Sequence, residues 1–131
     1  MRSTGISAMP TVLFLSPDSD LRAVASRVLT MAGCQVTAVA HAGHASLACI
    51  ERGDFDVVVI EDGMADASGD AIVGRLQRYC PDAAVVRMSD GLLARRRSDD
   101  GITVGRPFGA DDLIRAVSDA THYARRRTMT R

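Results

Sequence analysis

The chain has 131 residues, carries no net charge at pH 7, and holds 16 basic residues, all of them arginine. This length indicates one domain, and zero net charge provides no general attraction to nucleic acid or to an anionic membrane surface. The sequence has no apolar run long enough to span a membrane, and its first ten residues lack the apolar core of a signal peptide. We therefore expect a cytoplasmic protein.

Short apolar runs alternate with segments of helical periodicity, after a polar lead-in at residues 1–10. The runs that predict strands are 11–15, 35–39, 57–60, 84–88 and 102–104. The segments that predict helices are 21–32, 42–52, 70–80 and 111–127. Gly33 and Gly53 follow the first two helices, as is common where a helix ends. This alternation predicts a doubly wound α/β domain, with a parallel sheet and helices on both faces.

The same periodicity predicts which side chains of the helices are buried. The residues expected to face inward are Leu21, Val24, Ala25, Val28, Leu29, Ala32, Ala45, Ala48, Cys49, Ile72, Val73, Leu76, Tyr79, Leu113, Val117, Ala120 and Ala124. The three cysteines, Cys34, Cys49 and Cys80, lie in or beside apolar segments, which predicts buried, reduced thiols.

The run Val57–Ile60 has no polar break, which is typical of a strand buried on both faces of a parallel sheet. It ends at Glu61 and Asp62, and ligands of such sheets bind beyond the carboxyl ends of the strands. The two acids are therefore candidate site residues. Taken alone, they can equally well begin a solvated loop.

Four features in a fixed order resemble the response regulator receiver domain, the CheY-like phosphoacceptor module of bacterial two-component signalling. The segment Phe55–Glu61 looks like the family's Pro-Asp, followed by four apolar residues and the phosphoacceptor. Gly69 follows at the family's spacing, Ser89 ends the fourth strand, and Arg106–Phe108 looks like the family's Lys-Pro-Phe. The resemblance covers residues 11–124, nearly the whole chain.

The resemblance implies a five-stranded parallel sheet in the order 2-1-3-4-5, with the site at the switch point between strands one and three. The segment from Ser89 to Arg106 is shorter than in the family, which implies a shortened fourth helix. The receiver-like domain is expected at 11–127, with a tail at 128–131. In the family, two acids hold Mg²⁺, an Asp accepts the phosphoryl group, and a Ser or Thr and a Lys bind its oxygens.

The metal and acceptor positions of the family are altered in this chain. The two metal-binding acids fall on Ser16 and Pro17, which offer no carboxylate to Mg²⁺. Asp18 lies one place further along and is interpreted as a helix cap rather than a rescue ligand. The phosphoacceptor falls on Glu61, whose carboxylate lies about 1 Å beyond the productive position, enough to cost around a hundredfold in rate. Asp62 would point to the opposite face of the strand.

The phosphate-switch positions of the family fall on Ser89, Thr103 and Arg106. Ser89 matches the family, whereas Thr103 replaces its aromatic switch residue. Arg106 replaces the lysine, and its planar fork does not substitute for a point charge at a tight phosphate site. No lysine elsewhere in the chain can take its place.

These departures imply an atypical receiver, a pseudo-receiver of a two-component or phosphorelay system that binds a protein partner without being phosphorylated. We expect no enzyme activity and no cofactor, with Mg²⁺ absent or weakly bound. Glu61 can mimic the phosphorylated state, or the site can have decayed while the fold serves for docking. Two alternatives are a phosphorelay receiver with residual phosphotransfer and a small-ligand sensor that uses the switch-point crevice.

The expected partner is a signalling protein or an output domain, and a homodimer can form through the last helix and the 90–104 face. A shortened fourth helix would leave an apolar patch on that face. Nucleic acid and membranes are not expected partners, because Arg95–Arg97 and Arg125–Arg127 lack interleaved aromatic residues. His41 and His44 lack a third metal ligand at a suitable spacing, so they are interpreted as solvated residues at a helix start.

The last expectation is an ion pair between Glu61 and Arg106 across the mouth of the site. The family places these two positions within reach of each other, and a guanidinium offers two parallel donors to a carboxylate. The alternative is that both side chains are hydrated.

Overall fold

The computed structural model describes residues 9–61, 69–90, 97–98, 101–106 and 109–130. Only the backbone is described at 69–70, 89–90, 97–98, 101–106 and 125–130. The strands are β1 Thr11–Leu15, β2 Gln35–Val39, β3 Val57–Glu61, β4 Ala84–Asp90, β5 Arg97–Ser98 and β6 Gly101–Arg106. The helices are α1 Ser19–Met31, α2 Ala42–Arg52, α3 Gly69–Tyr79 and α4 Ala110–Thr130.

The strands form one sheet in the order β2-β1-β3-β4-β6-β5. The part β2-β1-β3-β4 is parallel and confirms the expected order of the first four strands. Beyond β4 the sheet differs from expectation, because parallel β6 is followed by a two-residue antiparallel strand, β5. The short β5 lies in the segment where a shortened fourth helix was expected. Only two residues join β5 to β6, a length that suits a tight hairpin rather than a helical crossover.

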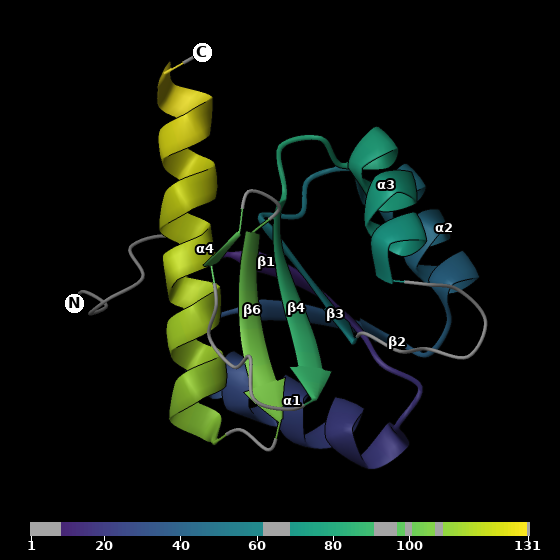
Figure 1. Cartoon of the computed structure of the whole chain (residues 1–131), viewed down its shortest axis with the longest axis vertical. Helices are drawn as coiled ribbons and strands as arrows, with labels where there is room; N and C mark the ends of the chain where they lie inside the picture. Colours follow the sequence, from purple (N-terminus) through teal and green to yellow (C-terminus); the bar gives the residue numbers. More distant parts are fainter. Residues whose placement is uncertain (1–8, 62–68, 91–96, 99–100, 107–108, 131) are drawn as a thin grey trace.

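The four helices cover both faces of the sheet, as expected for a doubly wound domain (Figure 1). α1 and α4 lie together on one face, and α2 and α3 lie together on the other (Figure 1). None of the helices in the described ranges is both long and apolar enough to cross a membrane.

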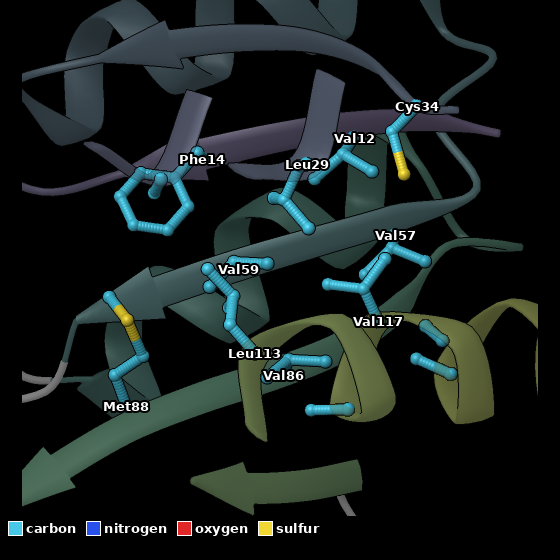
Figure 2. Close-up of a cluster of buried hydrophobic side chains, with 14 of the residues drawn as sticks. Val12, Phe14, Leu29, Cys34, Val57, Val59, Val86, Met88, Leu113 and Val117 are labelled. Atoms are coloured by element: carbon cyan, nitrogen blue, oxygen red, sulfur yellow. The ribbon is translucent and has the colours of Figure 1, made fainter. Parts of the chain in front are cut away.

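Two cores result, one on each face of the sheet. The core beneath α1 and α4 combines alternate side chains of β1, β3 and β4 with the inner faces of the two helices (Figure 2). Its residues are Val12, Phe14, Ala25, Leu29, Cys34, Val57, Val59, Ala84, Val86, Met88, Leu113, Ala116, Val117, Ala120 and Ala124. The core beneath α2 and α3 contains the strand residues between them, together with Cys49 and Cys80. The three cysteines are buried and unpaired by disulfides, as predicted.

Two of the residues expected to face inward are exposed. Val24 of α1 is 60% exposed and Tyr79 of α3 is 41% exposed. Both lie at the flank of the apolar stripe, where the curvature of the helix surface carries a side chain past the sheet. Cys80, the residue after Tyr79, is buried in its place.

Helix α4 runs to Thr130, so the backbone of residues 128–130 continues the helix rather than forming the expected separate tail. Asp111 and Asp112 lie in its first turn, where carboxylates suit the helix dipole. Its expected inner residues, Leu113, Val117, Ala120 and Ala124, are all buried.

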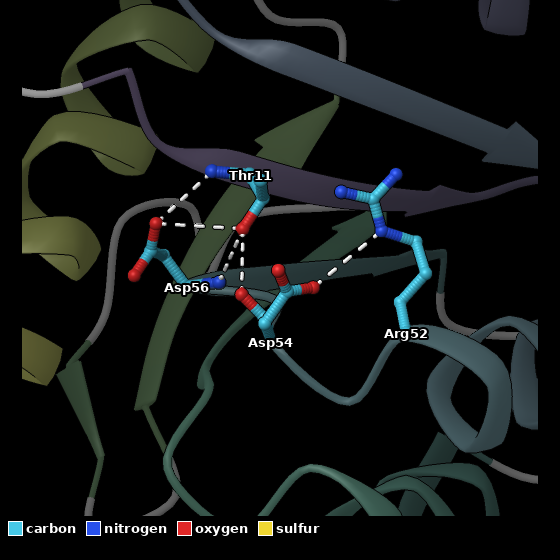
Figure 3. Close-up of polar contacts among 4 residues, drawn as sticks. All are labelled: Thr11, Arg52, Asp54 and Asp56. Carbon is cyan, nitrogen blue, oxygen red and sulfur yellow. Dashed lines mark hydrogen bonds and ion pairs between the residues drawn. The ribbon is translucent and has the colours of Figure 1, made fainter.

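The amino-terminal ends of β1 and β3 are joined by polar contacts (Figure 3). The Thr11 amide donates to the Asp56 carboxylate at 3.0 Å, and the Thr11 hydroxyl donates to the Asp54 carbonyl at 2.8 Å. The Asp56 amide donates in turn to the Thr11 hydroxyl at 3.2 Å. A nearby Arg52–Asp54 ion pair is exposed on both sides and contributes little. Thr11 and Asp56 therefore set the register at which the ladder begins.

Candidate functional site

The candidate site lies at the opposite end of the same ladder, where β1 and β3 reach the carboxyl edge of the sheet. Leu15 pairs with Ile60, so the next residues along the two strands, Ser16 and Glu61, lie side by side. Strand alternation turns both toward the face that also carries Phe14 and Val59. The register therefore brings a metal position and the acceptor position of the family together.

Ser16 and Glu61 are joined directly. The Ser16 hydroxyl donates to Glu61 Oε1 at 2.5 Å. Ser16 is fully buried, whereas Glu61 is partly exposed. Burial excludes water from the serine side of the contact, and the hydroxyl joins the two strand ends directly.

The loop after β1 is held by three further hydrogen bonds to Ser16. Its amide donates to the Val39 carbonyl at 3.1 Å, which ties the loop to the end of β2. Its hydroxyl accepts from the Asp18 amide at 3.1 Å, and its carbonyl accepts from Arg22 Nη1 at 2.8 Å. Ser16 is thus a junction between β2, β3 and the start of α1.

Asp18 is confirmed as the N-terminal cap of α1. Its carboxylate accepts from the amides of Asp20 at 3.0 Å and Leu21 at 3.2 Å. A capping side chain of this kind typically stabilises a helix by about 1 kcal/mol. Using the carboxylate as a metal ligand would compete with this cap.

The remaining site positions are described less fully. Pro17 is exposed in the loop after β1. Ser89, Thr103 and Arg106 are described by backbone only, with Ser89 paired to Gly105 and Arg106 to Asp90 across β4 and β6. Asp62 lies outside the described residues.

The Glu61–Arg106 ion pair remains a prediction, since the Arg106 side chain is among those not described. Glu61 pairs with Met88, and Met88 pairs with Val104. The backbone of Arg106 therefore lies two strands from Glu61 and two residues further along the sheet. Two strand spacings amount to roughly 10 Å, so the ion pair requires both side chains to extend across β4.

The two histidines lie where the sequence placed them. His41 precedes the first turn of α2 without a capping hydrogen bond, and its ring meets the edge of the His44 ring at 5.4 Å between centroids. Both are exposed. The triplets Arg95–Arg97 and Arg125–Arg127 have no described side chains.

Two contributors to the site were not anticipated from the sequence. One is the Ser16–Glu61 hydrogen bond, since Ser16 was regarded only as a poor metal ligand. A signal was available, because each residue directly follows the apolar run of its strand. The other is Arg22, whose contact with the Ser16 carbonyl reaches back over the first turn of α1 and has no local sequence signature.

We expect a double-mutant cycle of Ser16→Ala and Glu61→Met to show a coupling of about 1–2 kcal/mol. A hydrogen bond to a charged group is worth about 1.5–3 kcal/mol, and partial exposure of Glu61 reduces that value. Urea unfolding of the four proteins measures the coupling.

The control pairs Ser16→Ala with Asp56→Asn, at the other end of the ladder. These two changes should add to within about 0.5 kcal/mol, because the sites share no partner. Coupling below about 0.3 kcal/mol between Ser16 and Glu61 would show that their contact does not join the strands.

Solved receiver domains have the same fold as this chain. A response regulator receiver protein from Sinorhizobium medicae matches 88% of this chain and 97% of its own, with a TM-score of 0.76 and 24% identity. A response regulator receiver domain protein from Clostridium thermocellum matches 89% and 98%, with a TM-score of 0.78 and 18% identity. NtrX from Brucella abortus, solved in complex with ADP, matches 93% of this chain and 29% of its own, with a TM-score of 0.80 and 20% identity.

No protein-family model and no curated protein sequence matches the chain. The likeness is therefore one of three-dimensional structure, at identities too low to carry over a function. With its sheet order and its two helical layers, the chain has the CheY-like fold of response regulator receiver domains.

Proposed function

We propose that this chain is a pseudo-receiver, a signalling domain that acts by binding a protein partner without being phosphorylated. The observation that carries the proposal is the hydrogen bond from buried Ser16 to Glu61. In the receiver domains that this chain resembles, two acids after strand one hold Mg²⁺ and an Asp after strand three accepts the phosphoryl group. In this chain a neutral hydroxyl joins the same two strand ends.

The groups around this contact support weak metal binding. Mg²⁺ requires several oxygen ligands in near-octahedral geometry, usually including carboxylates. Ser16 supplies a hydroxyl that is already donating to Glu61, and Pro17 supplies no side-chain ligand. The Asp18 carboxylate accepts from two backbone amides of α1. A cation bound to the Ser16 hydroxyl or to Asp18 Oδ1 would compete with these hydrogen bonds.

The acceptor position also supports the proposal. Glu61 has its carboxylate fixed against Ser16, and its extra methylene relative to Asp moves the oxygen away from the position of in-line attack. A displacement of about 1 Å can lower a rate around a hundredfold. An anchored Glu61 therefore suits a domain held in one conformation.

We expect the wild-type chain to bind Mg²⁺ no more tightly than about millimolar, because Ser16 and Pro17 replace the two metal-binding acids of the family. We also expect it to keep its unmodified mass after incubation with Mg²⁺ and a small phosphodonor. Amide chemical shifts report the first result, and intact mass the second. Amide shifts around Asp18 and Glu61 that saturate at micromolar Mg²⁺, or an intact mass increased by one phosphoryl group, would instead favour the alternative of residual phosphotransfer.

The partner surface in this proposal is α4 together with residues 90–104, of which 91–96 and 99–100 lie outside the described residues. Within the described residues, β4 does not expose the expected apolar patch there. Val86 and Met88 point into the core beneath α4, so strand alternation places Arg87 on the other face, beside Thr103 of β6.

Arg115 is an exposed residue of α4 with which to test this surface. If the surface makes a homodimer, Arg115→Glu should reverse a charge at the interface and lower the mass measured by light scattering toward that of a monomer. Arg78→Glu, on exposed α3, is the matched control and should leave the mass unchanged. A wild-type chain that stays monomeric at high concentration would exclude self-association through this face.

A further inference from the structure

Cys49 and Cys80 are brought together by the tertiary structure, although 30 other residues separate them in the sequence. Cys49 lies near the end of α2, and Cys80 directly follows α3. The Cys80 thiol lies near the Cys49 thiol and contributes to raising its pKa. Both belong to the core beneath α2 and α3, where they are 1% and 3% exposed.

Each cysteine lies at an anchored point of the backbone. Gly53, which caps α2 in the left-handed region at φ 71°, follows Cys49 by one helical turn. The Cys80 amide donates to the Leu76 carbonyl at 2.8 Å, and its carbonyl accepts from the Ala83 amide at 3.1 Å. Two adjacent thiols on separately anchored backbones are the starting arrangement for a cross-link.

We propose that Cys49 and Cys80 form an intramolecular disulfide on exposure to a hydroperoxide. The bond would tie the carboxyl-terminal end of α2 to that of α3. Thiol oxidation needs neither Mg²⁺ nor a phosphodonor, so this inference is independent of the proposed pseudo-receiver function.

The oxidation proceeds in two steps. One thiol loses its proton, and the thiolate attacks a peroxide oxygen, forming a sulfenic acid and expelling hydroxide or alkoxide, which takes up a proton. The second sulfur then attacks the sulfenic sulfur, forming the S–S bond and releasing water. Together the two thiols lose two electrons and two protons. The hydroperoxide takes them up and becomes an alcohol and one water, or two waters when it is hydrogen peroxide. The second step is fast, because the partner sulfur is already adjacent.

Burial controls when the first step occurs. Burial is the main cause, and the neighbouring Cys80 thiol the second, of a Cys49 pKa raised to about 12. This thiol is therefore protonated at neutral pH. The closed native state therefore resists oxidation. The reaction proceeds from conformations in which the ends of α2 and α3 open locally, and the disulfide then holds them together.

The disulfide should change the stability of the folded chain. It would close a loop of about 30 residues, which by the chain-entropy model raises Tm by roughly 10 °C in a domain of this size.

The test treats the full-length wild-type protein with hydrogen peroxide, with and without mild urea to increase opening. Intact mass should fall by two hydrogens, and faster in urea, with a peptide map linking Cys49 to Cys80. Tm should rise by roughly 10 °C and return after reduction.

Cys34→Ala is the matched control, since Cys34 is equally buried but lies in the other core. This variant should still form the disulfide, whereas Cys49→Ala and Cys80→Ala should not. A link that includes Cys34, a link between two chains, or three thiols still open to alkylation after treatment would each overturn the proposal. The wild-type peptide map decides even if an alanine variant fails to fold.

Discussion

We expect a fourfold variant to bind Mg²⁺ and to become phosphorylated by a small phosphodonor. Its substitutions are Ser16→Asp, Pro17→Asp, Glu61→Asp and Arg106→Lys. Three carboxylates would meet at the ends of β1 and β3, where the register already places Ser16 beside Glu61. Their mutual repulsion creates a demand for a divalent cation. The Glu61→Asp change also shortens the acceptor to the length that the reaction requires.

Intact mass after incubation with phosphodonor and Mg²⁺ measures phosphorylation, and thermal unfolding with and without Mg²⁺ measures metal binding. With a Kd of about 1 mM, 10 mM Mg²⁺ should stabilise the variant by about 1.4 kcal/mol and leave the wild type unchanged. Glu61→Asp alone is the control, because it restores the acceptor without the metal ligands. Phosphorylation of that single variant would mean that Ser16 and Pro17 do not limit the reaction.

The largest effect on stability is expected from Leu29→Ala in helix α1. Leu29 is fully buried among Val12, Val57 and other residues of the core beneath α1 and α4 (Figure 2). Truncation removes apolar contacts and leaves a cavity, at a cost of about 3 kcal/mol. Tm should fall by roughly 10 °C, measured by circular dichroism.

Val24→Ala provides the matched control on the same helix. Val24 was expected to be buried but is 60% exposed, so its truncation should change stability by less than about 0.5 kcal/mol. Alanine is also the better helix former, which favours a small gain. A loss of about 2 kcal/mol at Val24 would show that this flank of α1 is covered in solution.

The elements near the start of the chain were predictable to the residue. β1, β2 and α2 have the bounds that their apolar runs and flanking glycines indicated. The signals there are local, since a strand requires a short apolar run and a helix end favours Gly53 in the left-handed region. The segment after β4 was harder to predict, because its two-residue strand, β5, exists only through pairing with β6.

The candidate site was predictable in its parts but not in its contacts. The apolar run of β3 identified Glu61, and the resemblance to receiver domains identified Ser16 and Asp18. The cap at Asp18 followed from local sequence alone. The hydrogen bond between Ser16 and Glu61 did not, because it depends on the parallel register of β1 and β3 across 45 residues. The expected partner of Glu61 was Arg106, whose side chain is not described.

The sequence by itself determined the alternation of strands and helices, the burial of the three cysteines and the absence of carboxylates at positions 16 and 17. These follow from residue type and short-range pattern. Only the tertiary structure decided that Val24 and Tyr79 face outward and that Cys49 meets Cys80. It alone also joined Ser16 to Glu61. Each of these depends on how helices and strands distant in sequence pack across the sheet, and local periodicity does not encode that packing.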